Sequence, residues 1–272
     1  PASREIPVTY ATILFERSSF AATITFNRPE VFNAYSETMS QELKSAVAAV
    51  SADEKVRVLY LKGAGENFLA GADINMLNGW AEVAKAKGAA EVKRILDGHF
   101  SPTSLEDLPI PVIALVDGRA WGMGSEIAIA ADIRICTTRA SFAQPEIALG
   151  LITGGGASQR LPRIVGSAVA TEMILTGKPL SATDAEKWGL VSAVVEPDKL
   201  LEAGMAIGKS IAAKSPLMVK WAKRCIQLTR DHSLQDGIQK ELTQFSETFT
   251  TEDAAEGTRA FLEKRKAVFV GR

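Results

Sequence analysis

Residues 117–146 read DGRAWGMGSEIAIAADIRICTTRASFAQPE, and this stretch decides the fold that we predict around it. The run before it, Pro111 to Val116, is apolar and rich in β-branched residues, which is typical of a buried strand. Three glycines then interrupt regular structure, namely Gly118, Gly122 and Gly124. A short helix from Ser125 to Ala131 and a strand from Asp132 to Thr137 are predicted next. After the buried strand, the chain is therefore expected to run in one direction along a helix and to come back along a strand.

Two glutamates lie near the two ends of this segment of helix and returning strand. Glu126 falls in the first turn of the predicted helix, and Glu146 follows a second short extended piece after the returning strand. The path out and back brings the two carboxylates together, and a pair of carboxylates is suited to general acid and general base catalysis. We therefore expect an enzyme that uses both glutamates. The glycine-rich helix start at Gly122 to Ser125 would hold developing negative charge beside them.

A second small-residue loop precedes another predicted helix, in the sequence FLAGADI at residues 68–74. Backbone N–H groups in such a loop can approach an oxyanion, because small side chains leave room and the helix dipole favours negative charge. Ala70 to Asp73 and Gly122 to Ser125 are both candidates, although each also fits a simple strand-to-helix connection. Neither loop matches the GxxxxGK[ST] or GxGxxG phosphate-binding patterns, and the sequence has no GxSxG nucleophile pattern.

The composition limits the classes of protein to which this chain can belong. With 272 residues, 46% of them hydrophobic, it can bury a core as one large domain or slightly more. The formal net charge of -1 gives no overall attraction to nucleic acid or to a membrane surface. No apolar run approaches the ~20 residues that span a bilayer, and no signal-peptide pattern opens the chain. The first residue is Pro1 and not methionine, so we expect a processed or trimmed N-terminus.

Cysteine and histidine usage disfavours thiol, triad and zinc chemistry. Cys136 and Cys225 lie in apolar contexts without CxxC spacing, so two buried free thiols are expected. They suit a reducing compartment, either the cytoplasm or, after processing, the mitochondrial matrix. His99 and His232 lie in polar, helical stretches, and we expect both on the solvated surface. No HExxH pattern or Cys/His cluster predicts a metal site, so carboxylates remain as the acid/base candidates.

The chain divides into a mixed α/β core over residues 1–197 and an all-helical region over residues 198–272. Apart from those already named, strands are expected at Val8–Arg17, Phe20–Phe26, Val56–Lys62 and Leu190–Val195. Further helices are expected from Glu37 onward, over 81–107, and at Ser158–Val165, Ala168–Leu175, Leu200–Ala213, Pro216–Thr229, Leu234–Phe249 and Thr251–Val268. Ser181 to Asp184 has the capping-box spacing of one more short helix.

Five stretches, taken together, resemble the crotonase superfamily, the enoyl-CoA hydratase/isomerase family, over nearly the whole chain. They are NRPEVFNA (27–34), FLAGADI (68–74), PVIALVDGRAWGMGSEIAIAADIRI (111–135), FAQPEIALGLITGGGASQRLPRIVG (142–166) and FLEKRKA (261–267). Their order and spacing make the resemblance specific. It implies a crotonase-like α/β fold, with a core of repeated ββα units that form a spiral. It also implies C-terminal helices that mediate trimerisation, commonly with two homotrimers joined in a homohexamer.

The same resemblance implies the substrate and the residues that bind it. The substrate is an acyl-CoA thioester whose carbonyl oxygen lies between two backbone N–H groups, which fall on Ala72 and Met123. Coenzyme A is part of the substrate, so no separate cofactor is expected, and neither nucleic acid nor a membrane is an expected partner. The other substrate-binding positions carried over by motif are Ala70, Gly71, Asp73, Ile74, Gly154, Phe261 and Lys264. Lys264 would reach the coenzyme phosphates, in some cases from a neighbouring subunit, although it also fits a solvated basic helix end.

The presence of both Glu126 and Glu146 favours hydration among the reactions of the family. Hydratases of the family have both acids, whereas many isomerases, hydrolases and decarboxylases lack or replace one. By analogy, Glu126 is the base toward water and Glu146 is the acid toward carbon. We therefore predict an enoyl-CoA hydratase of fatty acid or aromatic acid degradation. A cyclic dienoyl-CoA hydratase, a double-bond isomerase or a ring hydrolase stays an alternative, as does a non-catalytic RNA-binding or scaffold protein.

Three positions depart from the commonest family pattern. Met123 stands where glycine is usual, which keeps the backbone donor but adds a flexible side chain near the acyl group. Thr153 replaces a frequent proline in the glycine-rich turn, and Asn67 stands where a coenzyme-binding lysine is often found. The acyl group itself is not predicted, because the residues that would border its pocket fit the protein core equally well; they are Met76, Trp80, Trp121 and Met123.

Overall fold

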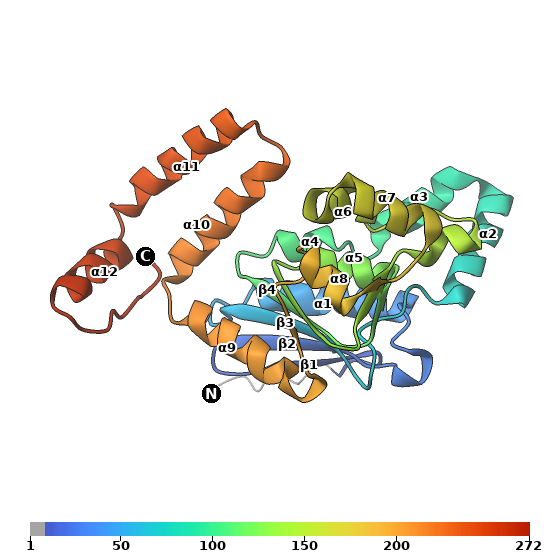
Figure 1. The fold of residues 1–272 in the computed structure, drawn as a ribbon, viewed down its shortest axis with the longest axis horizontal. Helices are drawn as coiled ribbons and strands as arrows, with labels where there is room; N and C mark the ends of the chain where they lie inside the picture. Colours follow the sequence, from blue (N-terminus) through green and yellow to red (C-terminus); the bar gives the residue numbers. More distant parts are fainter. Residues whose placement is uncertain (1–8) are drawn as a thin grey trace, which may run out of the picture.

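The computed structural model describes residues 9–272, and a six-stranded sheet forms its centre (Figure 1). The strand order across this sheet is β1-β2-β3-β4-β6-β9. The strands are β1 (Ile13–Arg17), β2 (Ala21–Phe26), β3 (Val58–Gly63), β4 (Val112–Val116), β6 (Ile133–Thr137) and β9 (Ala193–Val195). β1 and β2 pair antiparallel, and the later neighbours pair parallel. β1 starts later than the strand predicted from Val8, and Val8 itself lies outside the described residues.

A second sheet of three short strands has the order β5-β7-β8. Its strands are β5 (Arg119–Trp121), β7 (Ser141–Ala143) and β8 (Leu180–Ser181). Each of β5 and β7 comes directly after a strand of the large sheet and before a helix. Leu69 repeats this order after β3, because it forms a parallel bridge with Ala120 of β5 before the next helix begins. Two strands and a helix thus recur along the chain, which confirms the ββα spiral that the resemblance implies.

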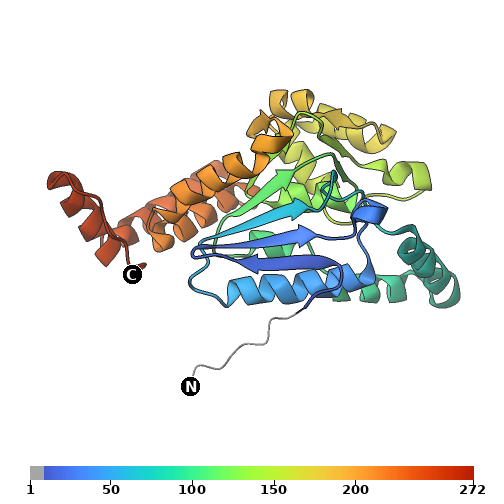
Figure 2. The ribbon, with the colours of Figure 1, turned by 90° about the horizontal axis from the view of Figure 1, so that it is seen from below.

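Alternate residues of the central strands pack on opposite faces of the large sheet. On one face, Leu59 and Leu61 join side chains of α1 (Glu37–Ser51) in the larger core cluster. On the other face, Val58 and Tyr60 lie in a cluster with residues of α9 (Leu200–Ala212). Figure 2 shows α1 running along the sheet on one side. The sequence analysis placed α9 in the C-terminal helical region, but its packing joins it to the core sheet.

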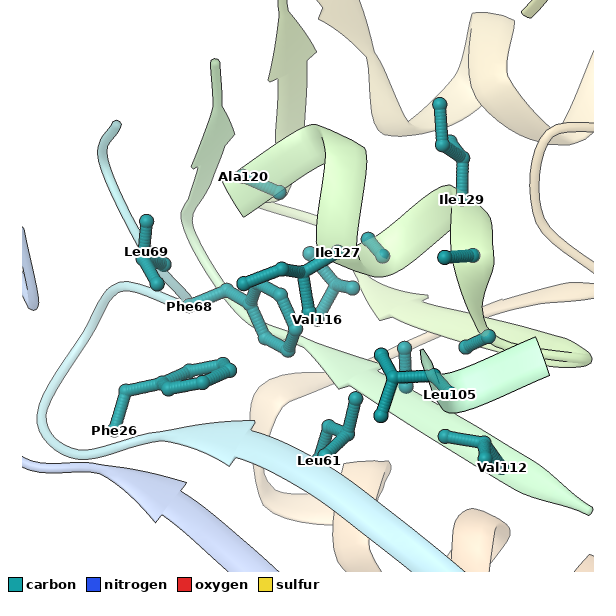
Figure 3. Packing of buried hydrophobic residues seen from close by; sticks show 14 of the residues in the cluster. Phe26, Leu61, Phe68, Leu69, Leu105, Val112, Val116, Ala120, Ile127 and Ile129 are labelled. Carbon is teal, nitrogen blue, oxygen red and sulfur yellow. The ribbon is translucent and has the colours of Figure 1, made fainter. Parts of the chain in front are cut away.

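The helix that carries Glu126, α5 (Met123–Ala130), is buried along its length except at Met123. Ile127 of this helix belongs to the same core cluster as Val116 of β4 and Phe68 (Figure 3). Phe68 in turn meets Phe26 edge to face, with ring centroids 5.1 Å apart. A helix packed on all sides holds its side chains in fixed directions. Glu126 is therefore presented from a rigid part of the core.

The connection between β3 and β4 contains three helices, whereas the sequence predicted a helix after the loop at 68–74 and one unbroken helical stretch over 81–107. They are α2 (Ile74–Lys87), α3 (Ala89–Gly98) and α4 (Thr103–Glu106). α2 ends at Gly88, which has φ 82°, a left-handed conformation that glycine adopts readily. A high content of alanine and lysine favoured helix on both sides of Gly88, so the periodicity did not reveal the break.

The remaining elements of the core are short helices in the connections between its other elements. They are η1 (Pro29–Val31), η2 (Pro145–Leu149), α6 (Ala157–Val165), α7 (Ser167–Thr176), α8 (Ala182–Lys187) and η3 (Pro197–Lys199). α8 begins as its capping box predicts, because Ser181 Oγ accepts a hydrogen bond from the Asp184 N–H (3.1 Å). β9 covers only the last half of the strand predicted over residues 190–195.

The C-terminal helices extend away from the sheets (Figures 1 and 2). They are α10 (Pro216–Gln227), η4 (Leu228–Arg230), α11 (Leu234–Thr248) and α12 (Glu252–Leu262). α12 is shorter than predicted, since the chain after it folds back and the N–H groups of Val270 and Gly271 donate to the buried Asp253 carboxylate. Among residues 9–272, no helix is both long enough and apolar enough to cross a membrane.

Candidate active site

Two small-residue loops run side by side at the start of α2 and of α5. The Leu69 N–H donates to the Arg119 carbonyl (3.0 Å), and the Trp121 N–H donates to the Leu69 carbonyl (3.0 Å). This pairing continues to the glycines, because a Cβ on Gly122 would lie 3.5 Å from Gly71 Cα. The two loops predicted as possible oxyanion sites are therefore neighbours in the fold.

Ala72 and Met123 follow these two glycines, and their backbone N–H groups are the candidate donors to an oxyanion. Tyr35 bridges the first loop: its N–H donates to the Gly71 carbonyl (2.8 Å), and its carbonyl accepts from the Asp73 N–H (2.8 Å). In a parallel bridge of this kind the central residue, here Ala72, directs its own N–H away from the partner. Met123 is the first residue of α5, where the helix leaves the N–H without an intrahelical acceptor. Neither N–H donates to a protein acceptor among residues 9–272.

Glu126 is buried, with 2% of its surface exposed, and is held by two backbone donors. Its Oε1 accepts hydrogen bonds from the N–H groups of Gly155 (2.7 Å) and Ala157 (3.1 Å), at the start of α6. Burial raises the pKa of this carboxyl, while the backbone hydrogen bonds and the positive charge of Arg160 oppose the rise. The hydrogen bonds favour the ionised form, so Glu126 is the better placed of the two acids to act as a base.

Glu146 lies in η2 with its carboxyl beside the glycine that precedes Met123. A Cβ on Gly122 would lie 3.0 Å from Glu146 Oε1. The other oxygen, Oε2, is buried and has no hydrogen-bond partner among the described residues. Burial raises the pKa of Glu146 to about 7, and the charge of Glu126 adds to the effect. Near neutral pH a substantial fraction of Glu146 is therefore protonated, as a proton donor must be.

The arrangement joins two carboxyl groups in unequal surroundings and two backbone N–H groups without a protein acceptor among residues 9–272 in one place. The sequence analysis expected Glu126 and Glu146 to meet, and the structure brings both to the loops that carry Ala72 and Met123. A carbonyl oxygen placed between the two N–H groups would gain stabilisation as it becomes negative. The site can therefore perform proton transfers on carbon next to a carbonyl group.

Three other predicted binding residues shape the first loop. The Ala70 N–H is already used, since it donates to the Phe32 carbonyl (3.1 Å). Asp73 caps α2 through the Asn75 N–H (3.0 Å) and pairs with Arg28 (3.2 Å). The hydrogen bond from Asn75, together with Arg28, lowers the pKa of Asp73. Ile74 is 52% exposed at the first position of α2, beside the site.

The remaining predicted binding residues are farther from the glutamates or less constrained. Gly154 is exposed in the turn before α6, with space around its Cα. Phe261 is 83% exposed in α12, and Lys264 is exposed just after it. Both views show α12 at the far end of the C-terminal extension, away from α5 (Figures 1 and 2). Within one chain, therefore, Phe261 and Lys264 are not brought to the glutamates.

One histidine prediction is wrong. His99 is buried, with 9% of its surface exposed. Its Nδ1 lies 2.7 Å from the Ile95 carbonyl, its Nε2 lies 3.0 Å from Glu37, and the Trp80 ring packs against it edge-on. The polar residues around it in the sequence face solvent, while His99 closes the end of α3 against α1. His232 is exposed as predicted.

The cysteines fulfil their prediction only in part. Cys136 is buried and Cys225 is half-buried, and both are free thiols. Among residues 9–272, no group of three or more His, Cys, Asp or Glu side chains is arranged to hold a metal ion.

The sequence analysis did not single out the residues that hold Glu126. Gly155 and Ala157 were quoted only as part of a motif, and Arg160 received no role. The one available signal was the run of three glycines at 154–156, which indicates close approach of other groups to the backbone. The sequence does not show which group approaches, because Glu126 lies in a different repeat of the spiral.

Comparison with known proteins gives the same picture. The model of a family described as enoyl-CoA hydratase/isomerase matches residues 16–272. A probable enoyl-CoA hydratase of Rhizobium meliloti is 38% identical, over 96% of this chain and 99% of its own length. A crotonyl-CoA hydratase of Syntrophomonas wolfei is 35% identical, over 97% and 99%. The crystal structure of an enoyl-CoA hydratase from Bacillus anthracis superposes with a TM-score of 0.87, at 34% identity, over 96% of this chain and all of that one. The chain belongs to the enoyl-CoA hydratase/isomerase family.

Proposed function

We propose that this protein is an enoyl-CoA hydratase that adds water across the α,β double bond of an acyl-CoA thioester. The observation that carries the proposal is the pair of glutamates beside two unused N–H donors. Glu126 and Glu146 have unequal surroundings: one carboxylate accepts two N–H groups, and the other has a buried oxygen without a partner. Unequal surroundings separate the roles of two acids in one site.

In this mechanism the thioester carbonyl oxygen accepts hydrogen bonds from the N–H groups of Ala72 and Met123. Glu126 removes a proton from water while the water oxygen bonds to the β-carbon, and the electron pair of the double bond moves toward the carbonyl. The resulting enolate is stabilised by the two N–H groups. Glu146 then gives its proton to the α-carbon. The product contains one added water, and proton exchange between the glutamates and solvent restores the starting forms.

Coenzyme A is part of the substrate in this proposal, and no other cofactor takes part. The family relationship supports an acyl-CoA substrate, and two relatives whose names specify the reaction support hydration, namely the crotonyl-CoA hydratase of Syntrophomonas wolfei and the short-chain-enoyl-CoA hydratase of Clostridium acetobutylicum. The proposed location is the cytoplasm, for which the two free thiols give the support.

The proposed assembly is a homotrimer or a homohexamer built through the C-terminal helices. Large apolar side chains are exposed along α11 and α12, where a lone chain would leave them in water. They include Leu234, Leu242, Phe245, Phe249, Phe261 and Leu262, all at least 57% exposed. In such an assembly, Phe261 and Lys264 would reach the site of a neighbouring subunit.

Hydration of crotonyl-CoA, followed by mass spectrometry of the product, tests the function. We expect a product that contains one added water, and a rate that falls by about 10² to 10⁴ in Glu126→Gln and in Glu146→Gln. Glu54→Gln is the matched control, because Glu54 is exposed on the far connection between α1 and β3. A product of unchanged mass would indicate isomerisation, and with a cyclic acyl-CoA as the substrate a product with a new carboxylate in the acyl group would indicate ring hydrolysis. No turnover with any acyl-CoA thioester would favour the non-catalytic RNA-binding or scaffold alternative.

A further inference from the structure

The loop that holds Glu126 is itself held from its opposite side by Arg160. The Gly155 N–H donates to Glu126 Oε1 (2.7 Å), and the Gly155 carbonyl accepts from Arg160 Nη1 (2.9 Å). One residue thus contacts the glutamate through its donor and the arginine through its acceptor. Any shift of the guanidinium would be passed to the Glu126 carboxylate through that residue.

The glycines at 155 and 156 make this double contact possible. A Cβ on Gly155 would lie 2.6 Å from Glu126 Oε2, and a Cβ on Gly156 would lie 2.1 Å from Arg160 Nη1. Gly156 also has φ 103°, which side chains other than hydrogen rarely permit. The loop is therefore thin enough for a carboxylate and a guanidinium to touch it from two sides.

Arg160 is fixed more firmly than a surface arginine. Its Nε and Nη2 donate to the two oxygens of Glu106, at 3.0 and 2.7 Å, and Nη2 also donates to Thr103 Oγ1 (2.9 Å). The two charged side chains are 16% and 6% exposed. A planar guanidinium paired with both oxygens of a buried carboxylate has a single orientation.

Glu106 is also bound to the C-terminal helical region. Arg230 Nη1 lies 2.7 Å from Glu106 Oε1, and Gln227 Nε2 donates to the Glu106 carbonyl (2.8 Å). Glu106, which holds Arg160, is therefore itself positioned by Gln227 of α10 and Arg230 of η4.

We propose that Arg160 is a positioning residue for Glu126, which fixes the Gly155 peptide while it is itself anchored on Glu106. This inference rests on the proposed hydratase function, in which Glu126 directs water at the β-carbon. Arg160 touches neither substrate nor reacting atoms in this role. Two charged groups interact electrostatically with the Glu126 carboxyl, namely Arg160 and the partly protonated Glu146. Arg160 is the positive one, so its removal takes away the charge that favours the ionised form of Glu126.

The test compares Arg160→Met with Arg163→Met from the same helix. Arg163 is exposed and its Nη1 donates to the Gln159 carbonyl in the same helix, so its loss should leave the rate unchanged. In Arg160→Met we expect kcat to fall about 10- to 100-fold, the effect of a small misplacement, with KM little changed. The acidic limb of the pH profile should move to higher pH, because the positive charge of Arg160 lowers the pKa of the Glu126 carboxyl. Equal kinetics and equal pH profiles in the two variants would overturn the proposal.

A second measurement asks whether the effect passes through Glu126. Arg160→Met should cost little further activity when it is added to Glu126→Gln, because two groups that act as a unit are not additive. If the two losses instead multiply, Arg160 acts elsewhere and the positioning role is wrong.

Two more variants serve as controls for a loss of activity that is caused by misfolding. Arg160→Lys keeps a positive charge beside Glu106 without the planar fork, and Arg160→Met combined with Glu106→Gln leaves no unpaired buried carboxylate. Both should show the kcat loss of Arg160→Met, and recovery of the wild-type rate in the double variant would contradict the proposal.

Hydrogen exchange of the peptide covering residues 150–160 gives a readout that needs no turnover. Exchange should be faster in these variants than in Arg163→Met, since the Gly155 carbonyl loses its Arg160 donor and the Gly155 peptide is no longer fixed from that side. Wild-type protein without hydratase activity would contradict the proposed function, while unchanged exchange would contradict the positioning role alone.

Discussion

The charge of Glu126 adds to burial in raising the pKa of Glu146 to about 7. In the proposed reaction this coupling favours Glu146 as the proton donor, because the Glu126 carboxylate accepts two N–H groups that favour its charge, whereas Glu146 Oε2 is buried without a partner among the described residues. The unequal surroundings of the two carboxyls therefore support the proposed division into a proton acceptor, Glu126, and a proton donor, Glu146.

The rate of hydration should decrease as the pH rises through about 7. The reaction needs Glu146 in its protonated form, and above its pKa that form becomes about tenfold rarer for each pH unit. A profile of kcat/KM between pH 5.5 and about 9 measures this limb. A rate that stays constant up to the alkaline end would show that Glu146 is not the proton donor.

Replacement of Glu146 by glutamine should stabilise the fold at alkaline pH. The folded state binds this proton more tightly than the unfolded state, whose pKa is near 4.5, so the stabilising contribution is complete below that pH and is lost as the pH approaches about 7. At pH 8 the ionised, partly buried carboxylate costs roughly 1 kcal/mol after allowance for solvent screening.

We therefore expect Glu146→Gln to unfold about 2–4 °C higher than wild type at pH 8 and at the same temperature near pH 4.5. Differential scanning calorimetry at the two pH values measures the difference, with Glu54→Gln as the control. An equal shift at both values would mean that the change acts through packing and not through charge.

Substitution of Gly124 by alanine should damage the pair of backbone donors. A Cβ at this position would lie 2.0 Å from the Leu69 carbonyl oxygen, so α5 must move away from the first loop. We expect a stability loss of about 1–3 kcal/mol from overpacking and at least a tenfold loss of kcat/KM, because the two N–H groups separate. Gly98→Ala is the control, since a Cβ there meets nothing within 4 Å. Wild-type kinetics in Gly124→Ala would argue against the oxyanion site.

Introduction of a charge at Phe245 should dissociate the proposed assembly. Phe245 is 57% exposed and packs edge to face with Phe249, so it lies on an apolar surface of α11 that residues 9–272 leave uncovered. We expect Phe245→Asp to lower the mass measured by light scattering to that of one chain, and to raise KM for the acyl-CoA. Lys240→Glu, an exposed change on the same helix, should leave the mass unchanged. A wild-type protein of single-chain mass at micromolar concentration would contradict the trimer itself.

The sequence predicted the meeting of Glu126 and Glu146 because the path between them is local. A buried run, three glycines, a short helix and a returning strand are all visible as patterns within two consecutive repeats of the spiral, about 30 residues of chain. The resemblance supplied Ala72 and Met123, and the bridge between Leu69 and Ala120 explains why these two positions are neighbours.

The residues that patterns did not predict act across repeats. Arg160 reaches Glu106, which lies in a different helix and far earlier in the chain, so no local spacing indicates the pair. His99 was misplaced for a related reason, since its partners Glu37 and Trp80 come from two other helices. The break at Gly88 was hidden because helix-favouring residues lie on both of its sides.

The absence of a side chain at Gly155 also has a consequence for how this family can vary. The space that a Cβ would occupy there is filled by Glu126, whose Oε2 would be 2.6 Å away. A homologue that replaces Glu126 with a small residue no longer fills that space, so larger residues become acceptable at position 155. The two positions should therefore co-vary across the family, and a glycine at 155 should mark the chains that retain the glutamate.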